Sequence, residues 1–148
     1  MTATMTSALP DPDRQPVFYD GVPAKRLMAW VADVVLIFVL MLIIGVLTLT
    51  VAFWLWPIFW VVTSFLYRSL TIAAGSATLG MRLMNIELRG PTGARLTGTQ
   101  AMLHTAAYLI SASFFLPQVA SIALILLGPR GQSLPDLFLG TAAINRPR

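Results

Sequence analysis

The chain has 148 residues, of which 57% are hydrophobic and 11% charged, and its mean hydropathy is +0.77. Soluble domains carry roughly 25% charged residues because their surface faces water, so this composition excludes a soluble domain and predicts an integral membrane protein. The absence of cysteine excludes disulfides and thiolate chemistry. The net charge of +4 comes from cations whose placement indicates a membrane orientation rather than a nucleic-acid partner.

The first 21 residues are polar and rich in proline and aspartate, which predicts a mobile tail ahead of one membrane domain over residues 22–148. The tail lacks the basic start, apolar run and cleavage site of a signal peptide.

Two apolar runs follow, at about residues 27–49 and 57–74. The 34 residues from Val34 to Tyr67 carry no charge and would extend about 51 Å as one helix, whereas a bilayer core needs only about 20 residues. The chain must therefore turn back, and the tryptophans at 54, 56 and 60 place the turn at a membrane surface, near Thr50 to Pro57. Pro57 suits the first turn of the second helix.

Residues 75–98 are more polar. Apolar and polar side chains alternate from Met84 to Arg89, which is the periodicity of a strand. The Gly-Pro-Thr-Gly turn at residues 90–93 leads into a second short strand at residues 94–97. This pattern predicts a short amphipathic hairpin, Met81 to Thr97, at the cytoplasmic membrane surface.

The third apolar run covers about residues 101–128 and contains Pro117. It predicts either one kinked span or two short re-entrant helices with Pro117 at the tip. With the amino terminus in the cytoplasm, seven of the ten cations fall inside and the outer turn has none. A re-entrant third segment places all ten inside, whereas a span places the last three outside. The fold class predicted is thus an all-α membrane protein with three apolar segments.

Asp33 is the one charge within the first apolar run. An ionised carboxylate about two turns into a membrane helix costs about 2.5–3.5 kcal/mol on insertion scales, so Asp33 is expected to have a partner. Arg68 lies at the same depth if the outer turn is centred near residue 50 or 51, and Arg26 or Arg82 at the cytoplasmic end is the second choice. Each arginine could instead contact lipid phosphates and make no pair with Asp33.

Three motifs resemble the RDD family, in the order expected for that family. They are A-K-R-L-M-A-W-V-A-D at residues 24–33, T-L-G-M-R-L at 78–83 and L-P-D-L-F-L-G-T at 134–141. The resemblance implies that Arg26, Asp33 and Asp136 are the signature residues. It also implies a multi-pass membrane protein, with transport as one suggested activity. Met81 and Pro135 stand where the family pattern usually has lysine and histidine.

The pattern Ser133-Leu-Pro-Asp136 is also that of a helix capping box, with aspartate at the third helical position. His104 is the only histidine, so it cannot build a zinc site without several carboxylates. His104 and Ser111 lie seven residues apart, about 10.5 Å along a helix, which is too far for a nucleophile pair. We therefore expect no cofactor, no metal and no catalytic residues.

Three functions are consistent with the predicted membrane protein. The first is a non-catalytic accessory or scaffold subunit of the inner (cytoplasmic) membrane, packed against a larger membrane complex or against itself. The second is an oligomeric transporter of small ions that uses Asp33. The third is a membrane-embedded enzyme, which would need a pocket that places His104 beside a second polar group.

Overall fold

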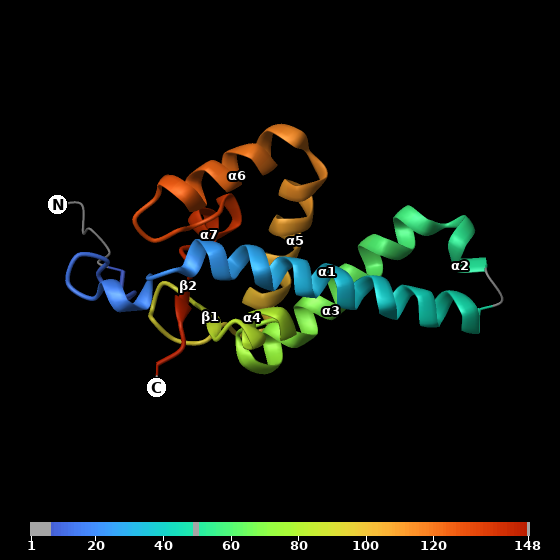
Figure 1. Cartoon of the computed structure of the whole chain (residues 1–148), viewed down its shortest axis with the longest axis horizontal. Helices are drawn as coiled ribbons and strands as arrows, with labels where there is room; N and C mark the ends of the chain where they lie inside the picture. The colour runs from blue at the N-terminus through green and yellow to red at the C-terminus, as the bar shows by residue number, and fades with distance from the viewer. Residues whose placement is uncertain (1–6, 49–50, 148) are drawn as a thin grey trace.

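The computed structural model describes residues 7–48 and 51–147. They form a mainly helical protein with one two-stranded sheet (Figure 1). The first long helix, α1 (Val22–Leu47), follows a single 3₁₀ turn, η1 (Pro16–Phe18), and has 26 residues. That length is about 39 Å, enough to cross a bilayer core of about 30 Å.

A short helix, α2 (Val51–Trp54), joins α1 to the second long helix, α3 (Trp56–Gly75). Both long helices are sufficiently long and apolar to cross a membrane. Residue 50, one of the two positions given for the centre of the predicted outer turn, lies outside the described residues. Gly45 sits beneath the Phe53 ring, where an added Cβ would be 2.6 Å from the ring Cζ, so α2 can fold closely onto the end of α1.

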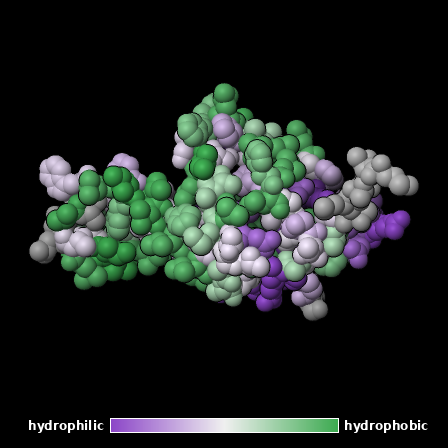
Figure 2. Space-filling view, turned by 180° about the vertical axis from the view of Figure 1, so that it is seen from behind, coloured by the Kyte–Doolittle hydropathy of each residue, from purple (hydrophilic) through white to green (hydrophobic). Residues whose placement is uncertain are grey.

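The distal halves of α1 and α3 project as a two-helix arm from the rest of the molecule. Figure 2 shows that most of the visible face of this arm is hydrophobic. Its exposed side chains include Val39, Ile43, Val46 and Ile58. A water-soluble protein rarely exposes an apolar patch of this extent, so the arm is a surface for lipid or for another membrane protein.

After α3, a one-turn helix, α4 (Leu79–Leu83), leads into strand β1 (Ile86–Arg89). The strand is where the alternating pattern predicts it, but the predicted hairpin is wrong. β1 pairs antiparallel with β2 (Ala142–Asn145), from Ile86 opposite Asn145 to Arg89 opposite Ala142. Residues 94–97 form no strand, and the partner of β1 is instead a segment more than fifty residues further along the chain.

The third apolar run forms two helices, α5 (Gly98–Ser113) and α6 (Phe115–Leu127), bent by 115° relative to each other. The break is at Phe114, whose backbone is extended, and not at Pro117 as predicted. In a continuous helix the Pro117 ring would clash with the carbonyl of Ser113. Because the helix breaks at Phe114, three residues before the proline, Pro117 lies in the first turn of α6, where its missing N–H costs no hydrogen bond.

A short last helix, α7 (Leu134–Leu139), precedes β2. Because β2 pairs with β1, the α5–α6 pair begins and ends at the same end of the molecule, where α1 also begins. Lys25 Nζ, near the start of α1, lies 2.6 Å from Asn145 Oδ1 in β2. The first and last described segments, residues 7–21 and β2, therefore lie at this end, opposite the arm (Figure 1).

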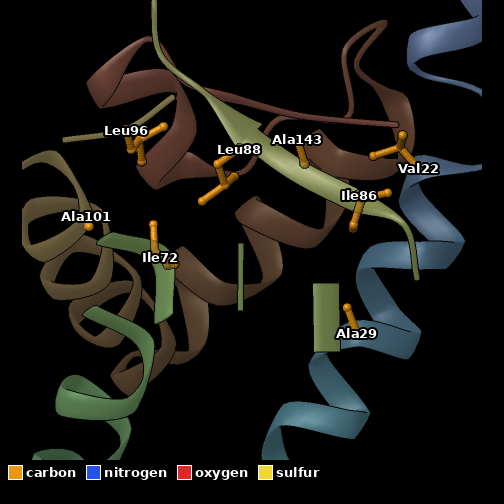
Figure 3. Packing of buried hydrophobic residues seen from close by; sticks show 8 residues of the cluster. All are labelled: Val22, Ala29, Ile72, Ile86, Leu88, Leu96, Ala101 and Ala143. Atoms are coloured by element: carbon orange, nitrogen blue, oxygen red, sulfur yellow. The ribbon is translucent and has the colours of Figure 1, made fainter. Parts of the chain in front are cut away.

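The main buried cluster joins these segments (Figure 3). It comprises Val22, Ala29, Ile72, Ile86, Leu88, Leu96, Ala101 and Ala143. Part of the segment 7–21, for which the sequence predicts a mobile tail, contacts the sheet. Leu9 and Tyr19 are buried with Ala142 and Ile144, and the side-chain amide of Asn145 donates to the carbonyls of Val17 and Asp20. Residues 1–6 of that predicted tail lie outside the described residues.

Candidate functional site

Asp33 lies on the inward face of α1 and is 1% exposed. Its Oδ1 accepts hydrogen bonds from the Tyr67 hydroxyl at 2.6 Å and from the Gly80 N–H at 2.8 Å. Its Oδ2 accepts one from the Thr78 hydroxyl at 2.5 Å. These three bonds satisfy much of the acceptor capacity of a carboxylate buried away from water. They also connect α1 to α3 and to the start of α4.

The backbone of α4 comes close to Asp33 because residue 80 is glycine. An added Cβ at Gly80 would lie 2.2 Å from the Ala29 carbonyl oxygen and 2.8 Å from Asp33 Oδ1. Thr78 is the N-cap residue of α4, and its side-chain oxygen also accepts from the Met81 N–H. The T-L-G part of the middle motif therefore supplies a helix cap and a close backbone approach to the carboxylate.

Arg68, on α3, approaches Asp33 as the depth argument predicts. Its Nη1 lies 3.8 Å from Asp33 Oδ2, and its guanidinium carbon lies 4.4 Å from the centre of the Tyr108 ring. Arg82, the other candidate on this side, instead donates from Nη2 to the Thr71 carbonyl at 3.1 Å. The structure thus brings Asp33 together with Arg68 and directs Arg82 to the last turns of α3.

Arg26 contacts the other signature carboxylate. Its Nη1 lies 2.8 Å from Asp136 Oδ2, although the two residues stand at opposite ends of the domain sequence. Asp136 Oδ1 lies 2.8 Å from His104 Nε2 and accepts from the Thr141 hydroxyl at 2.8 Å. Asp136 is fully buried, so α1, α5 and α7 meet at one carboxylate.

The same carboxylate caps its own helix. The Ser133 hydroxyl accepts from the Asp136 N–H, and Asp136 Oδ2 accepts from the Ser133 N–H at 2.9 Å, so the predicted capping box is present. Burial raises the pKa of Asp136, but the charge of Arg26, the contact with His104 and the Ser133 N–H outweigh burial and hold the pKa well below its usual range. Asp136 is therefore ionised at neutral pH.

Asp33 and the partners of Asp136 border one partly open cavity of about 580 Å³, which lies mainly between α1, α3, α5 and α6. Its polar lining includes Arg26, Asp33, Arg68, His104 and Thr105, and most of the remaining wall is apolar. Among residues 7–48 and 51–147, no group of three or more metal-ligating side chains comes together. Of the signature residues that the resemblance identifies, Arg26 and Asp33 line this cavity, and Asp136 contacts two of its lining residues, Arg26 and His104.

Sequence reasoning missed several partners at this site. His104, Tyr67 and Thr78 face the carboxylates, and only Thr78 had a local signal, as a threonine ahead of a short helix. Glu87 was also missed as a buried charge. It is 1% exposed on β1 and pairs with Arg89, while Arg95 and Arg146 lie 3.8 and 3.5 Å away.

The fold and this site define a small helical membrane protein whose signature charges pair across its interior. The chain belongs to the RDD family, whose sequence pattern matches residues 21–140. Neither the curated proteins nor the solved structures searched contain a match. Pro135, at the position where the family motif usually has histidine, is buried near the start of α7, and the imidazole beside Asp136 comes from His104 instead.

Proposed function

We propose that this protein is a non-catalytic accessory subunit of the cytoplasmic membrane, which packs against a larger membrane protein or against a second copy of itself. The observation that carries this proposal is that both signature carboxylates are already held by fixed internal partners. Asp33 accepts three hydrogen bonds, and Asp136 contacts Arg26, His104, Ser133 and Thr141. Groups held in this way join helices together.

The orientation proposed has the amino terminus in the cytoplasm and the arm across the membrane. The α5–α6 pair then enters and leaves from the cytoplasmic side, as a re-entrant pair. This orientation is supported by the sheet, which holds the end of the chain beside the start of α1. It is also supported by the cations, since residues 51–56 contain none.

The surface proposed for a partner is the two-helix arm. α1 and α3 bury only one seam against each other there, and side chains such as Val39 and Ile43 point outward. Aromatic contacts near the tip, with Phe53 stacked on Trp56 at 5.6 Å between ring centres, stiffen the arm. A preformed apolar surface loses little conformational freedom on binding.

Ion transport through Asp33 is the competing function. A carried ion would have to displace the Tyr67, Thr78 and Gly80 donors, which are spread over two helices and a helix cap. An enzyme is the third candidate, and its requirement for a polar group beside His104 is met by Asp136. Within the described residues, however, no hydroxyl or amine hydrogen-bonds to the imidazole of His104 as a nucleophile would.

Two measurements test the accessory role. A photo-crosslinking residue at Ile43, on the arm, should yield a discrete adduct with one membrane protein or with the chain itself, whereas the same residue at Asp13 should not. The purified chain alone in liposomes should show no ion flux. Flux that disappears in Asp33→Asn would overturn the accessory role in favour of transport.

A further inference from the structure

The geometry points to a lipid site: we propose that the cavity binds an anionic phospholipid of the surrounding membrane. The phosphate would lie against Arg68, and an acyl chain would leave between α1 and α6. This inference goes beyond the accessory role and does not depend on it.

Arg68 is the side chain that we expect to bind the phosphate. The residue is 8% exposed and lines the cavity, and its Nε is buried without a hydrogen-bond partner among the described residues. Asp33 is too distant, at 3.8 Å, to accept one, and its oxygens already accept from Tyr67, Thr78 and Gly80. Arginine has five N–H donors arranged in a planar fork that matches a phosphate.

Thr105 is a second unsatisfied group on the same cavity wall. Its hydroxyl is buried without a hydrogen-bond partner among the described residues, and the residue is 1% exposed. Thr105 lies one helical turn before Tyr108, whose ring covers one face of Arg68. Buried polar groups are normally hydrogen-bonded, so an occupant with several acceptor oxygens would satisfy both side chains.

The rest of the cavity suits a hydrocarbon chain. Leu27 and Trp30 on α1, and Ile122 and Leu126 on α6, line it and are 42 to 67% exposed. The apolar wall therefore reaches the outer surface of the molecule, where lipid chains would lie. The volume of the cavity, about 580 Å³, falls within the range of about 300–1,000 Å³ typical of small-ligand sites.

The depth of Arg68 fits a lipid better than a free anion. Arg68 stands seven residues before the end of α3, about 10 Å along the axis from the end nearest the termini, which places it in the half of α3 nearer the cytoplasmic surface in the proposed orientation. Basic pockets between membrane helices on the cytoplasmic side are characteristic sites for acidic headgroups. A free phosphate would leave the apolar wall empty.

The test is native mass spectrometry of the full chain in detergent, titrated with phosphatidylglycerol or with phosphatidylcholine of the same acyl chains. The wild type should retain phosphatidylglycerol at least about tenfold more tightly, since hydrogen bonds to a charged group are involved. Arg68→Gln should lose this preference. Arg95→Gln, which removes an exposed cation outside the cavity, should keep it.

A second pair of variants tests the chain-binding wall and does not disturb Asp33. Ile122 and Leu127 are both exposed on α6, but only Ile122 lines the cavity. Ile122→Trp should weaken phosphatidylglycerol binding at least about fivefold, because it fills the apolar part, and Leu127→Trp should not. Equal binding of the two lipids by the wild type, or equal binding by the two tryptophan variants, would overturn the proposal. Displacement of phosphatidylglycerol by inorganic phosphate at similar affinity would also overturn it.

Discussion

Arg26 Nη1 lies 2.8 Å from Asp136 Oδ2, so the first turns of α1 are joined to α7 by a buried ion pair. The side chain of Arg26 is 12% exposed and that of Asp136 is fully buried. Removing one member of such a pair leaves the other buried and uncompensated, which costs about 3–5 kcal/mol. The ion pair therefore links the first sequence motif to the last one in the folded protein.

Asp136→Asn should lower the free energy of unfolding by about 3 kcal/mol. The thermal unfolding midpoint in detergent should fall accordingly. The variant keeps the shape of the side chain but removes the charge that faces Arg26. Asp13→Asn, at an exposed position, is the matched control and should leave the midpoint unchanged. Equal midpoints for the two variants would show that the pair contributes nothing to stability.

The lowered pKa of Asp136 predicts an acid-dependent loss of stability. The folded-state pKa lies below the unfolded value of about 3.9, so the contribution is complete above that value and declines as the pH falls from it toward the folded pKa. Between pH 6 and pH 3 the wild type should therefore lose more stability than Asp136→Asn. Parallel pH profiles for the two proteins would contradict the assignment.

Asp33 and Arg68 should be energetically coupled across α1 and α3. In a double-mutant cycle on unfolding in detergent, Asp33→Asn and Arg68→Gln should each destabilise, and together cost less than their sum by about 0.5–3 kcal/mol. The control cycle pairs Asp33→Asn with Arg82→Gln and should be additive, because Arg82 contacts the Thr71 carbonyl instead. Strict additivity in the first cycle would mean that 3.8 Å is too far for the pair to interact.

Gly80→Ala should destabilise the protein by about 1–3 kcal/mol through overpacking. The new Cβ would meet the Ala29 carbonyl oxygen at 2.2 Å and push α4 away from Asp33. Gly98→Ala, at the start of α5, places its Cβ in open space and should be neutral. The comparison of the two melting temperatures checks the close approach, and a neutral Gly80→Ala would disprove it.

The proposed orientation predicts a labelling pattern for single cysteines in intact cells. Cysteine at Val51, beside the outer turn, should react with a membrane-impermeant reagent from outside. Cysteines at Asp13 and Pro147 should react only after the membrane is opened, because the segment around Leu9 and Tyr19 packs on β2, near the end of the chain. Labelling of Pro147→Cys from outside would require α5–α6 to cross the membrane.

Local patterns were sufficient for the features that depend on neighbouring residues. Uncharged runs predict α1 and α3, alternation predicts β1, and the Ser133 to Asp136 spacing predicts the capping box. The depth of Arg68 could also be predicted, because two antiparallel helices joined by a short turn have a fixed register. Membrane class follows from composition alone, since too few charges exist to cover the surface.

Only the tertiary structure decided which distant segments meet. β1 pairs with β2 rather than with residues 94–97, Asp136 meets Arg26 and His104, and the helix break is at Phe114 rather than at Pro117. The strand pairing and the partners of Asp136 have no local signal, because a strand edge or a buried charge accepts any suitable partner that packing brings within reach. The helix break does have a local cause in Pro117, but the proline is accommodated in the first turn of α6 and not at the bend. The buried cluster at the terminal end makes that selection, since it fixes where α1, α5 and the sheet lie relative to one another.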